Sequence, residues 1–338
     1  IFRIYSMTKP LTSVAALVLM ERGQMQLADA VIDHLPEFDP RMVSVPMQEG
    51  FEIVPARRRI TIHDLLTHSS GLTYGMRCAN TPVREAHERF ALDVNPRGLH
   101  VEGLIDGLTR APLAHQPASV WEYGFSTDLL GAVIERVAGR DLGTFLAETV
   151  FGPLGMHDTG FVIGGDRRAR LAEPFPVDPL TGAALLDPSQ RFDATVAPRM
   201  HSGGAGGLST LGDYLRFAQM LLAGGALDGT RILAPASVRL MTADHLGRRI
   251  ATPLPPGEAA MNSPGYGFGL GVAVRLEDGL ANVPGSRGDF FWSGTAGTTF
   301  WVDPREALCV VFMAQAPGAM RIRLRRMVRQ FVYGALLD

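Results

Sequence analysis

The strand-forming sequence of this 338-residue chain is concentrated near its end, and helix-forming sequence fills its middle. Between about residues 29 and 158, apolar residues recur with helical spacing, separated by irregular, proline-rich connections. After Gly265 the pattern changes to short runs of apolar and aromatic residues bounded by turns. This order predicts a fold that combines helices with a sheet.

Individual elements follow from the same patterns. The helical spacing of apolar residues over 12–21 predicts a helix that begins at Ser6 or just after it and ends before Gly23. Pro10 supports this start, because proline is favoured in the first helical turn, and Gly23 supports the end, because glycine is favoured after the last. The later helices are expected over 62–66, 101–108, 127–137, 142–150, 211–222 and 318–337, with a long connection over 159–206. Strands are expected over 1–5, 266–275, 290–292, 298–302 and 307–314, with a turn at 303–306.

Composition limits the class of protein. Hydrophobic residues make up 46% of the chain and charged residues 20%, which is typical of a folded globular protein. At roughly 150 residues per domain, the length suggests two domains or one large domain with an insertion. The net charge of −2 removes the electrostatic argument for nucleic acid or an anionic membrane as the main partner. The longest apolar run near the start, 14–20, is far shorter than the ~20 residues of a membrane span.

The cysteines and histidines do not form a metal-binding pattern. Cys78 and Cys309 are too few for a disulfide framework or a structural zinc site, and we expect them to be small buried residues in a reducing compartment. His63 and His68 are five residues apart and do not share a helix face, which favours capping or packing over metal ligation. No metal or cofactor is therefore expected.

The chain opens without the basic and apolar layout of a signal peptide. It enters a strand-like pattern at once, from which we expect that upstream residues are missing. Localisation stays open, with the cytoplasm favoured, and the sequence leaves the oligomeric state open.

Two further patterns have structural interpretations. Four alternating glycines are expected on one face of a strand that something bulky approaches closely: Gly265, Gly267, Gly269 and Gly271. The closing helix carries five arginines, which we expect on a solvated face of a helix packed against the sheet, in preference to a membrane or phosphate surface: Arg321, Arg323, Arg325, Arg326 and Arg329.

The strongest chemical signal is Ser6-Met7-Thr8-Lys9, a serine and a lysine three residues apart at a helix start. Lys9 is the only lysine among 32 basic residues, so this position is expected to need an ammonium that can lose its proton. The spacing places both side chains on one helix face, where Oγ and Nζ can share a hydrogen bond. A serine becomes nucleophilic when a base accepts its proton, and a lysine can do so once its surroundings lower its pKa from ~10.4. The alternative is a helix-capping serine beside a solvated lysine.

Residues 2–10 resemble the nucleophile segment of the serine β-lactamase and penicillin-binding-protein superfamily, and Ser-Met-Thr-Lys is similar to the motif of its family VIII carboxylesterases. Segments 60–72, 151–159 and 203–220 resemble further signatures of that group. The resemblance thus spans nearly the whole chain.

This resemblance implies a class C β-lactamase-like fold of the α/β (α+β) class. An antiparallel sheet flanked by helices would be built from the two ends of the chain, 1–28 and 207–338. A mostly helical domain, 29–206, would be inserted between them, with the site in the cleft between the two.

The resemblance also assigns roles to residues. Tyr123 is the expected third catalytic residue, whose phenolic oxygen relays protons between Ser6, Lys9 and the leaving group; its alternative is a core tyrosine before a helix. The backbone N–H groups of Ser6 and Thr295 would form the oxyanion hole, and Gly294 would permit the close backbone approach.

Two departures from the lactamase pattern concern the substrate. Phe125 stands where lactamases place an amide side chain, and Trp292, which begins the third motif Trp292-Ser293-Gly294, stands where they place a lysine. Both changes replace a polar group with apolar surface, so a pocket of Phe125, Trp292, Ser293 and Gly294 suits an uncharged ester better than an anionic lactam.

The expected function is therefore that of a serine carboxylesterase acting on short to medium acyl esters through an acyl-enzyme on Ser6, with weak or no β-lactamase activity. Its partner would be a small-molecule ester. Two alternatives use the same site: an acyltransferase with an alcohol or amine acceptor, and a penicillin-binding module that acylates without turnover.

Overall fold

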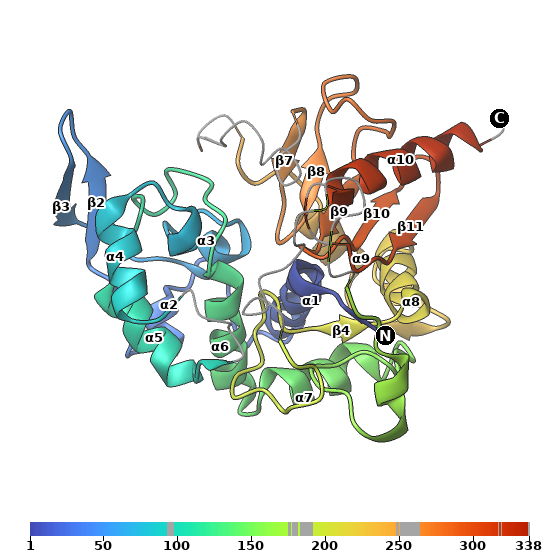
Figure 1. The fold of residues 1–338 in the computed structure, drawn as a ribbon, viewed down its shortest axis with the longest axis horizontal. Coiled ribbons are helices and arrows are strands. Elements are labelled where there is room, and N and C mark those ends of the chain that lie inside the picture. Colours follow the sequence, from blue (N-terminus) through green and yellow to red (C-terminus); the bar gives the residue numbers. More distant parts are fainter. Residues whose placement is uncertain are drawn as a thin grey trace.

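The structure is a computed structural model that describes residues 1–92, 98–174, 177, 182, 192–247, 250, 264–316, 318 and 320–336. Its centre is an antiparallel five-stranded sheet in the order β11-β10-β9-β8-β7, drawn in orange and red in Figure 1. The strands are β7 (Tyr266–Phe268), β8 (Ala273–Arg275), β9 (Phe290–Ser293), β10 (Thr299–Asp303) and β11 (Leu308–Phe312).

Helices cover both faces of the sheet (Figure 1). On one face lies α10 (Met320–Gly334), and on the other lie α8 (Leu211–Leu222) and α1 (Thr8–Glu21). The alternation of side chains along β10 matches this layering: Phe300 packs on Tyr214 of α8, whereas Trp301 stacks on Tyr333 of α10. Every residue of α1 from Thr8 to Leu19 is buried, because this helix also packs against the helical part of the molecule.

The helical part lies beside the sheet and occupies the blue to green region of Figure 1. It includes α2 (Val31–His34), α3 (Ile62–Leu66), α4 (Thr81–Arg89), α5 (Val101–Arg110), α6 (Ser126–Ala138) and α7 (Leu142–Leu146), with the hairpin of β2 (Met42–Pro46) and β3 (Phe51–Pro55). Short elements complete the chain: β1 (Phe2–Arg3) pairs with β4 (Leu208–Ser209), β5 (Ala226–Leu227) pairs with β6 (Thr230–Arg231), and α9 (Pro235–Met241) precedes the sheet.

Most expected elements are present, and α3 and α8 have the expected bounds. The single strand expected over 266–275 is wrong, because β7 and β8 form a hairpin whose turn contains Gly269 and Gly271. Each of these glycines is approached closely, but not on one strand face. A Cβ on Gly269 would lie 2.2 Å from the Met241 carbonyl oxygen, and one on Gly271, at φ 88°, would lie 2.0 Å from Ser13 Oγ. The β2–β3 hairpin was not expected. The two cysteines are free and half-buried, not fully buried.

The expectation of a solvated arginine face on the closing helix is also wrong in part. Arg323 and Arg326 are exposed, but Arg329 is buried and forms an ion pair with Asp289, which also pairs with Arg275 at 3.0 Å. The hydroxyl of Tyr266 donates to the same carboxylate at 2.7 Å. Burial of two guanidinium groups is possible here because a remote carboxylate compensates them.

We expect Asp289→Ala to lower the free energy of unfolding by about 3–5 kcal/mol, since it leaves two buried guanidinium groups without their carboxylate. Denaturant unfolding measures this loss. Asp106→Ala is the matched control, because it removes the partner of Arg110 from an exposed ion pair on α5 and should cost no more than about 1 kcal/mol. Equal losses in the two variants would contradict the structural role of the buried cluster.

Candidate active site

Ser6 lies in a single 3₁₀ turn, Tyr5–Met7, that leads directly into α1. Its backbone is held on both sides: the N–H of Ile4 donates to the Gly207 carbonyl oxygen at 3.1 Å, and the hydroxyl of Tyr214 donates to the Met7 carbonyl oxygen at 2.8 Å. Tyr5 has φ 45°, in the left-handed region that a bulky residue rarely adopts. The side chain of Ser6 is half-buried, and its hydroxyl forms no hydrogen bond with any residue that the structure describes. The turn therefore presents a fixed, unengaged hydroxyl.

Lys9 is fully buried in the first turn of α1. Its Nζ donates to the Gly204 carbonyl oxygen at 2.8 Å and contacts the Tyr74 hydroxyl at 3.4 Å. The direct hydrogen bond to Ser6 that the spacing allows is not made, because Nζ is turned toward Gly204. Among the described residues, no carboxylate forms an ion pair with this ammonium. The alternative of a solvated lysine is therefore excluded.

Tyr123 lies directly over this lysine, with Nζ 4.5 Å from the centre of its ring. The side chain is 7% exposed, and its buried hydroxyl has no hydrogen-bond partner among the described residues. Its neighbours are aromatic: His68, Trp121 and Trp292 have ring centres 4.9, 6.3 and 5.6 Å away. A buried hydroxyl without a partner costs folding free energy, and such groups are often kept for chemistry.

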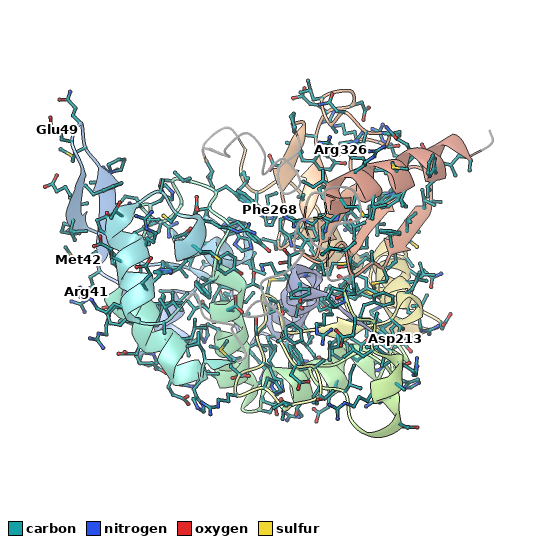
Figure 2. The ribbon with its side chains drawn as sticks, in the orientation of Figure 1. Arg41, Met42, Glu49, Asp213, Phe268 and Arg326 are labelled. Atoms are coloured by element: carbon teal, nitrogen blue, oxygen red, sulfur yellow. The ribbon has the colours of Figure 1, made fainter. Side chains whose placement is uncertain are left out.

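The ring of His68 packs against the ring of Tyr123. His68 is fully buried in the loop after α3, at φ 54°, and burial holds the pKa of its imidazole well below the ordinary value, with the Lys9 charge lowering it further. The ring is therefore neutral at physiological pH and adds no charge beside Lys9. Phe268 of β7, which Figure 2 labels, packs on His68 with ring centres 5.7 Å apart and so joins the sheet to the helical part.

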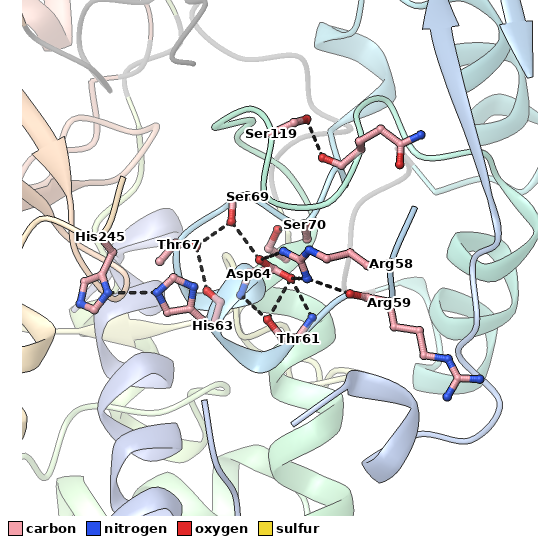
Figure 3. A network of polar contacts seen from close by, with 12 residues as sticks. Arg58, Arg59, Thr61, His63, Asp64, Thr67, Ser69, Ser70, Ser119 and His245 are labelled. Atoms are coloured by element: carbon pink, nitrogen blue, oxygen red, sulfur yellow. Dashed lines mark hydrogen bonds and ion pairs between the residues drawn. The ribbon is translucent and has the colours of Figure 1, made fainter. Parts of the chain in front are cut away.

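A polar network holds the loop that carries His68 (Figure 3). The buried carboxylate of Asp64 accepts two hydrogen bonds from Arg58, each of 2.7 Å, and one from the backbone N–H of Thr61 at 2.8 Å. Ser69 donates to the same carboxylate at 3.3 Å, and its hydroxyl lies 2.9 Å from that of Thr67. The network fixes both residues that flank His68.

Asp128 lies near the start of α6 and is a further residue of this site. Its buried carboxylate accepts hydrogen bonds from Ser202 and from the N–H of Gly204, whose carbonyl oxygen binds Lys9. Burial raises the pKa of the Asp128 carboxyl, and the Lys9 charge opposes that shift. A Cβ at Gly204 would lie 2.3 Å from Asp128 Oδ2, so a larger residue there would displace this carboxylate. In the sequence, the one indication of this residue was that Asp128 is the single charged residue between positions 123 and 134.

The loop after β9 brings Gly294 against the nucleophile segment. A Cβ on Gly294 would lie 2.3 Å from the Ile4 carbonyl oxygen, so this position requires glycine. The loop is closed by hydrogen bonds from Gly294 N–H to the Thr298 carbonyl oxygen (2.9 Å) and from Gly297 N–H to the Gly294 carbonyl oxygen (3.0 Å). The backbone N–H groups of Ser6 and Thr295 donate to no residue that the structure describes.

The side chains of the four expected pocket residues do not all lie on the side of the sheet that faces Tyr123. Trp292 is buried beside Tyr123, and Phe125 is buried with its ring 4.8 Å from that of Tyr74. Ser293 follows Trp292 in the strand, so its side chain points to the opposite face, where its hydroxyl lies 2.8 Å from Thr299 Oγ1. The Ser293 hydroxyl is thus directed toward α10, away from Tyr123.

Among the described residues, no three His, Cys, Asp or Glu side chains gather closely enough to hold a metal ion. His63 instead contacts His245, with Nε2 and Nδ1 3.0 Å apart (Figure 3). Within the same described part of the chain, no helix has the length and apolar character needed to cross a membrane.

The antiparallel sheet, the helical part beside it and the serine turn that enters a helix with a buried lysine together define the class C β-lactamase-like fold of a serine hydrolase. The chain belongs to the beta-lactamase family, whose model, described as beta-lactamase, matches residues 1–332.

Relatives of known name cover most of the chain. Protein Rv1367c of Mycobacterium tuberculosis is 35% identical over 328 residues, covering 93% of this chain and 77% of its own. Esterase EstB of Burkholderia gladioli is 33% identical over 348 residues, covering 96% of this chain and 81% of its own. The solved structure of EstCE1, described as a hydrolase with promiscuous acyltransferase activity, matches with a TM-score of 0.78 and 29% identity, covering 98% of this chain and 84% of its own.

Proposed function

We propose that this protein is a serine carboxylesterase that hydrolyses short to medium acyl esters through a covalent acyl-enzyme on Ser6, with Lys9 and Tyr123 as the other catalytic residues. The observation that carries the proposal is the fully buried Nζ of Lys9, 4.5 Å from the ring centre of a tyrosine whose hydroxyl has no partner among the described residues. The name of the related esterase EstB supports the same class of reaction.

The reaction begins with attack of Ser6 Oγ on the carbonyl carbon of the ester. Lys9 and Tyr123 accept the serine proton and return it to the leaving alcohol, so that the C–O bond of the ester breaks with a neutral product. Water then attacks the acyl carbon, and its proton passes through Tyr123 and Lys9 to Ser6 Oγ as the Oγ–acyl bond breaks, which releases the carboxylic acid and restores the serine. The N–H groups of Ser6 and Thr295 would stabilise the oxyanion in both steps.

The surroundings of the site favour an uncharged substrate. Phe125 and Trp292 present buried aromatic surface where a lactamase would need polar groups for an acylamino side chain and a carboxylate. Such a surface binds an apolar acyl chain without desolvating a charge. We therefore expect activity on p-nitrophenyl esters of short to medium chain length and little turnover of β-lactams.

A fluorophosphonate probe tests the assignment, because it labels an activated serine covalently. Peptide mass mapping of the labelled protein should place the probe on Ser6, and a panel of p-nitrophenyl esters should give the preferred acyl length. A label on another residue, in protein that hydrolyses the esters, would rule out the proposal.

Tyr123→Phe separates catalysis from stability. Because the hydroxyl has no partner to lose, the variant should be as stable as the parent or slightly more stable, while kcat falls by about 10²-fold or more. Tyr214→Phe is the matched comparison for stability: it removes a hydroxyl that donates to Met7 and should lower the free energy of unfolding by about 1–2 kcal/mol. Full ester hydrolysis by Tyr123→Phe would exclude the proposed relay.

An acyltransferase is the second candidate, favoured by the description of EstCE1 as a hydrolase with promiscuous acyltransferase activity. Both activities share the acyl-enzyme and differ only in whether water or an alcohol removes the acyl group. The ratio of acid to new ester, measured with and without an added alcohol, distinguishes them. A dominant ester product at low alcohol concentration would favour the transferase.

A further inference from the structure

An arginine of α10 forms hydrogen bonds with the backbone of the loop after β9. The Nη2 group of Arg325 donates a hydrogen bond to the Gly294 carbonyl oxygen and another, of 3.1 Å, to that of Thr298. This side chain was expected on a solvated face, but it is half-buried against the sheet. Arg325 lies on the same side of the sheet as Ser293, Thr299 and Trp301, whereas Trp292 packs on the other side, beside Tyr123.

The charge of Arg325 is not compensated by an acid. Among the described residues, no carboxylate forms an ion pair with it, and its Nε is buried without a partner. Burial and the like charge of Arg321 lower the pKa of the Arg325 guanidinium to about 9, which leaves it charged at neutral pH. The charge is therefore directed at two backbone carbonyl groups, whose oxygens offset part of the cost of removing it from water.

The Gly294 carbonyl belongs to the same peptide group as the N–H of Thr295. In a planar trans peptide these two groups point in opposite directions, so the Thr295 N–H points away from Arg325. A cation hydrogen-bonded to the carbonyl oxygen polarises the peptide and makes its N–H a stronger donor. That N–H donates to no described residue and is one of the two expected oxyanion donors.

We propose that Arg325 is a positioning residue of the oxyanion hole, which orients the Gly294–Thr295 peptide and strengthens the Thr295 N–H as a donor. This inference rests on the proposed function, because it requires acyl transfer at Ser6. When Oγ bonds to the acyl carbon, the carbonyl π pair moves onto oxygen and the serine proton passes to Lys9 and Tyr123. When the intermediate collapses, that pair re-forms the carbonyl and the alcohol leaves with the proton. A stronger donor favours the oxyanion over the neutral ester, so Arg325 acts on kcat.

A simpler role for Arg325 would be to anchor α10 to the sheet, and kinetics distinguishes the two. Arg325→Met should lower kcat about 10- to 100-fold with KM little changed, a smaller loss than the ~10²–10³ for removal of a whole oxyanion donor. Arg325→Lys, which keeps a buried cation, should recover part of this loss. Arg323→Met removes an exposed arginine from the same helix and should leave kcat unchanged.

Inhibition by butylboronic acid adds a measurement that anchoring alone would not change. Its tetrahedral adduct with Ser6 places an oxygen in the oxyanion hole, so its Ki should rise in Arg325→Met by the same factor by which kcat/KM falls. Infrared spectra of the acyl-enzyme should place the acyl C=O stretch at a higher wavenumber in Arg325→Met, and at an intermediate one in Arg325→Lys, because the hydrogen bond to that oxygen is weaker.

Unchanged kcat and boronate Ki in a folded Arg325→Met protein would overturn the inference and leave α10 anchoring as the role of this arginine. If Arg325→Met does not fold, Arg325→Gln removes the charge while keeping a polar side chain, and an unshifted C=O stretch with unchanged kcat in that variant would overturn the inference in the same way. Neither result affects the labelling of Ser6 by a fluorophosphonate. Conversely, a fluorophosphonate label on a residue other than Ser6 would rule out the proposed function, independently of the kinetics of the Arg325 variants.

Discussion

Ser6→Ala should abolish ester hydrolysis, with kcat for p-nitrophenyl butyrate at least about 10⁴-fold lower than in the parent protein. The loss is large because no acyl-enzyme can form without the hydroxyl, and the remaining groups only bind and polarise the ester. The hydroxyl has no hydrogen bond with a described residue, so its removal should change the melting temperature little. Initial rates and thermal unfolding measure the two effects.

Ser13→Ala is the matched control for this change. It makes the same substitution in α1, at a buried serine whose hydroxyl has no partner among the described residues and contacts the β7–β8 turn. Its activity should equal that of the parent. Retention of most esterase activity by Ser6→Ala would show that another residue is the nucleophile and that the proposed function is wrong.

Lys9→Arg and Lys9→Met should both lower kcat by about 10²–10⁴-fold. A guanidinium keeps the charge but does not release a proton near neutral pH, and a thioether has neither charge nor acceptor, so the two losses should be similar in size. If positive charge alone mattered, the arginine variant would retain most activity. The comparison thus tests proton transfer specifically, by measuring kcat in both variants.

Arg22→Met serves as the control for the lysine variants, because it removes an exposed charge from the end of the same helix. It should leave kcat unchanged. Both lysine variants need a folding check by thermal unfolding, since Nζ holds the Gly204 carbonyl oxygen at 2.8 Å. A folded Lys9→Arg protein with parental kcat would contradict the role of Lys9 as a proton acceptor.

The helices and the sheet were predictable wherever periodicity is strong and local. The 3.6-residue period of 211–222 and the turn at 303–306 give elements at the expected places. The β2–β3 hairpin was missed because each strand is short, half exposed and ends in proline, so that the alternation of Val43-Ser44-Val45 and Phe51-Glu52-Ile53 covers only three residues in each. The β7–β8 hairpin was mistaken for one strand because its turn contains glycines that also fit a strand with close neighbours.

The residues of the candidate site were predictable in type but not in their partners. The spacing of Ser6 and Lys9 predicted that Oγ and Nζ could share a hydrogen bond, which is not made, and nothing local indicated that the buried Nζ would bind Gly204, almost 200 residues away. For the same reason helical periodicity did not distinguish Arg325 and Arg329 from the exposed arginines of α10. Their partners, Gly294 and Asp289, belong to other elements, and long side chains bury their stems at almost any helical position.

The serine turn is held by segments that are remote in the chain: Ile4 by Gly207, Met7 by Tyr214, and the Ile4 carbonyl by Thr298. Each of these contacts closes a loop of about 200 residues or more, and long loops lose much chain entropy before any contact compensates them. During folding, the turn can therefore gain its native surroundings only after most of the polypeptide has already collapsed. A partly folded intermediate with native-like helices would therefore be inactive, because its serine turn would not yet be formed.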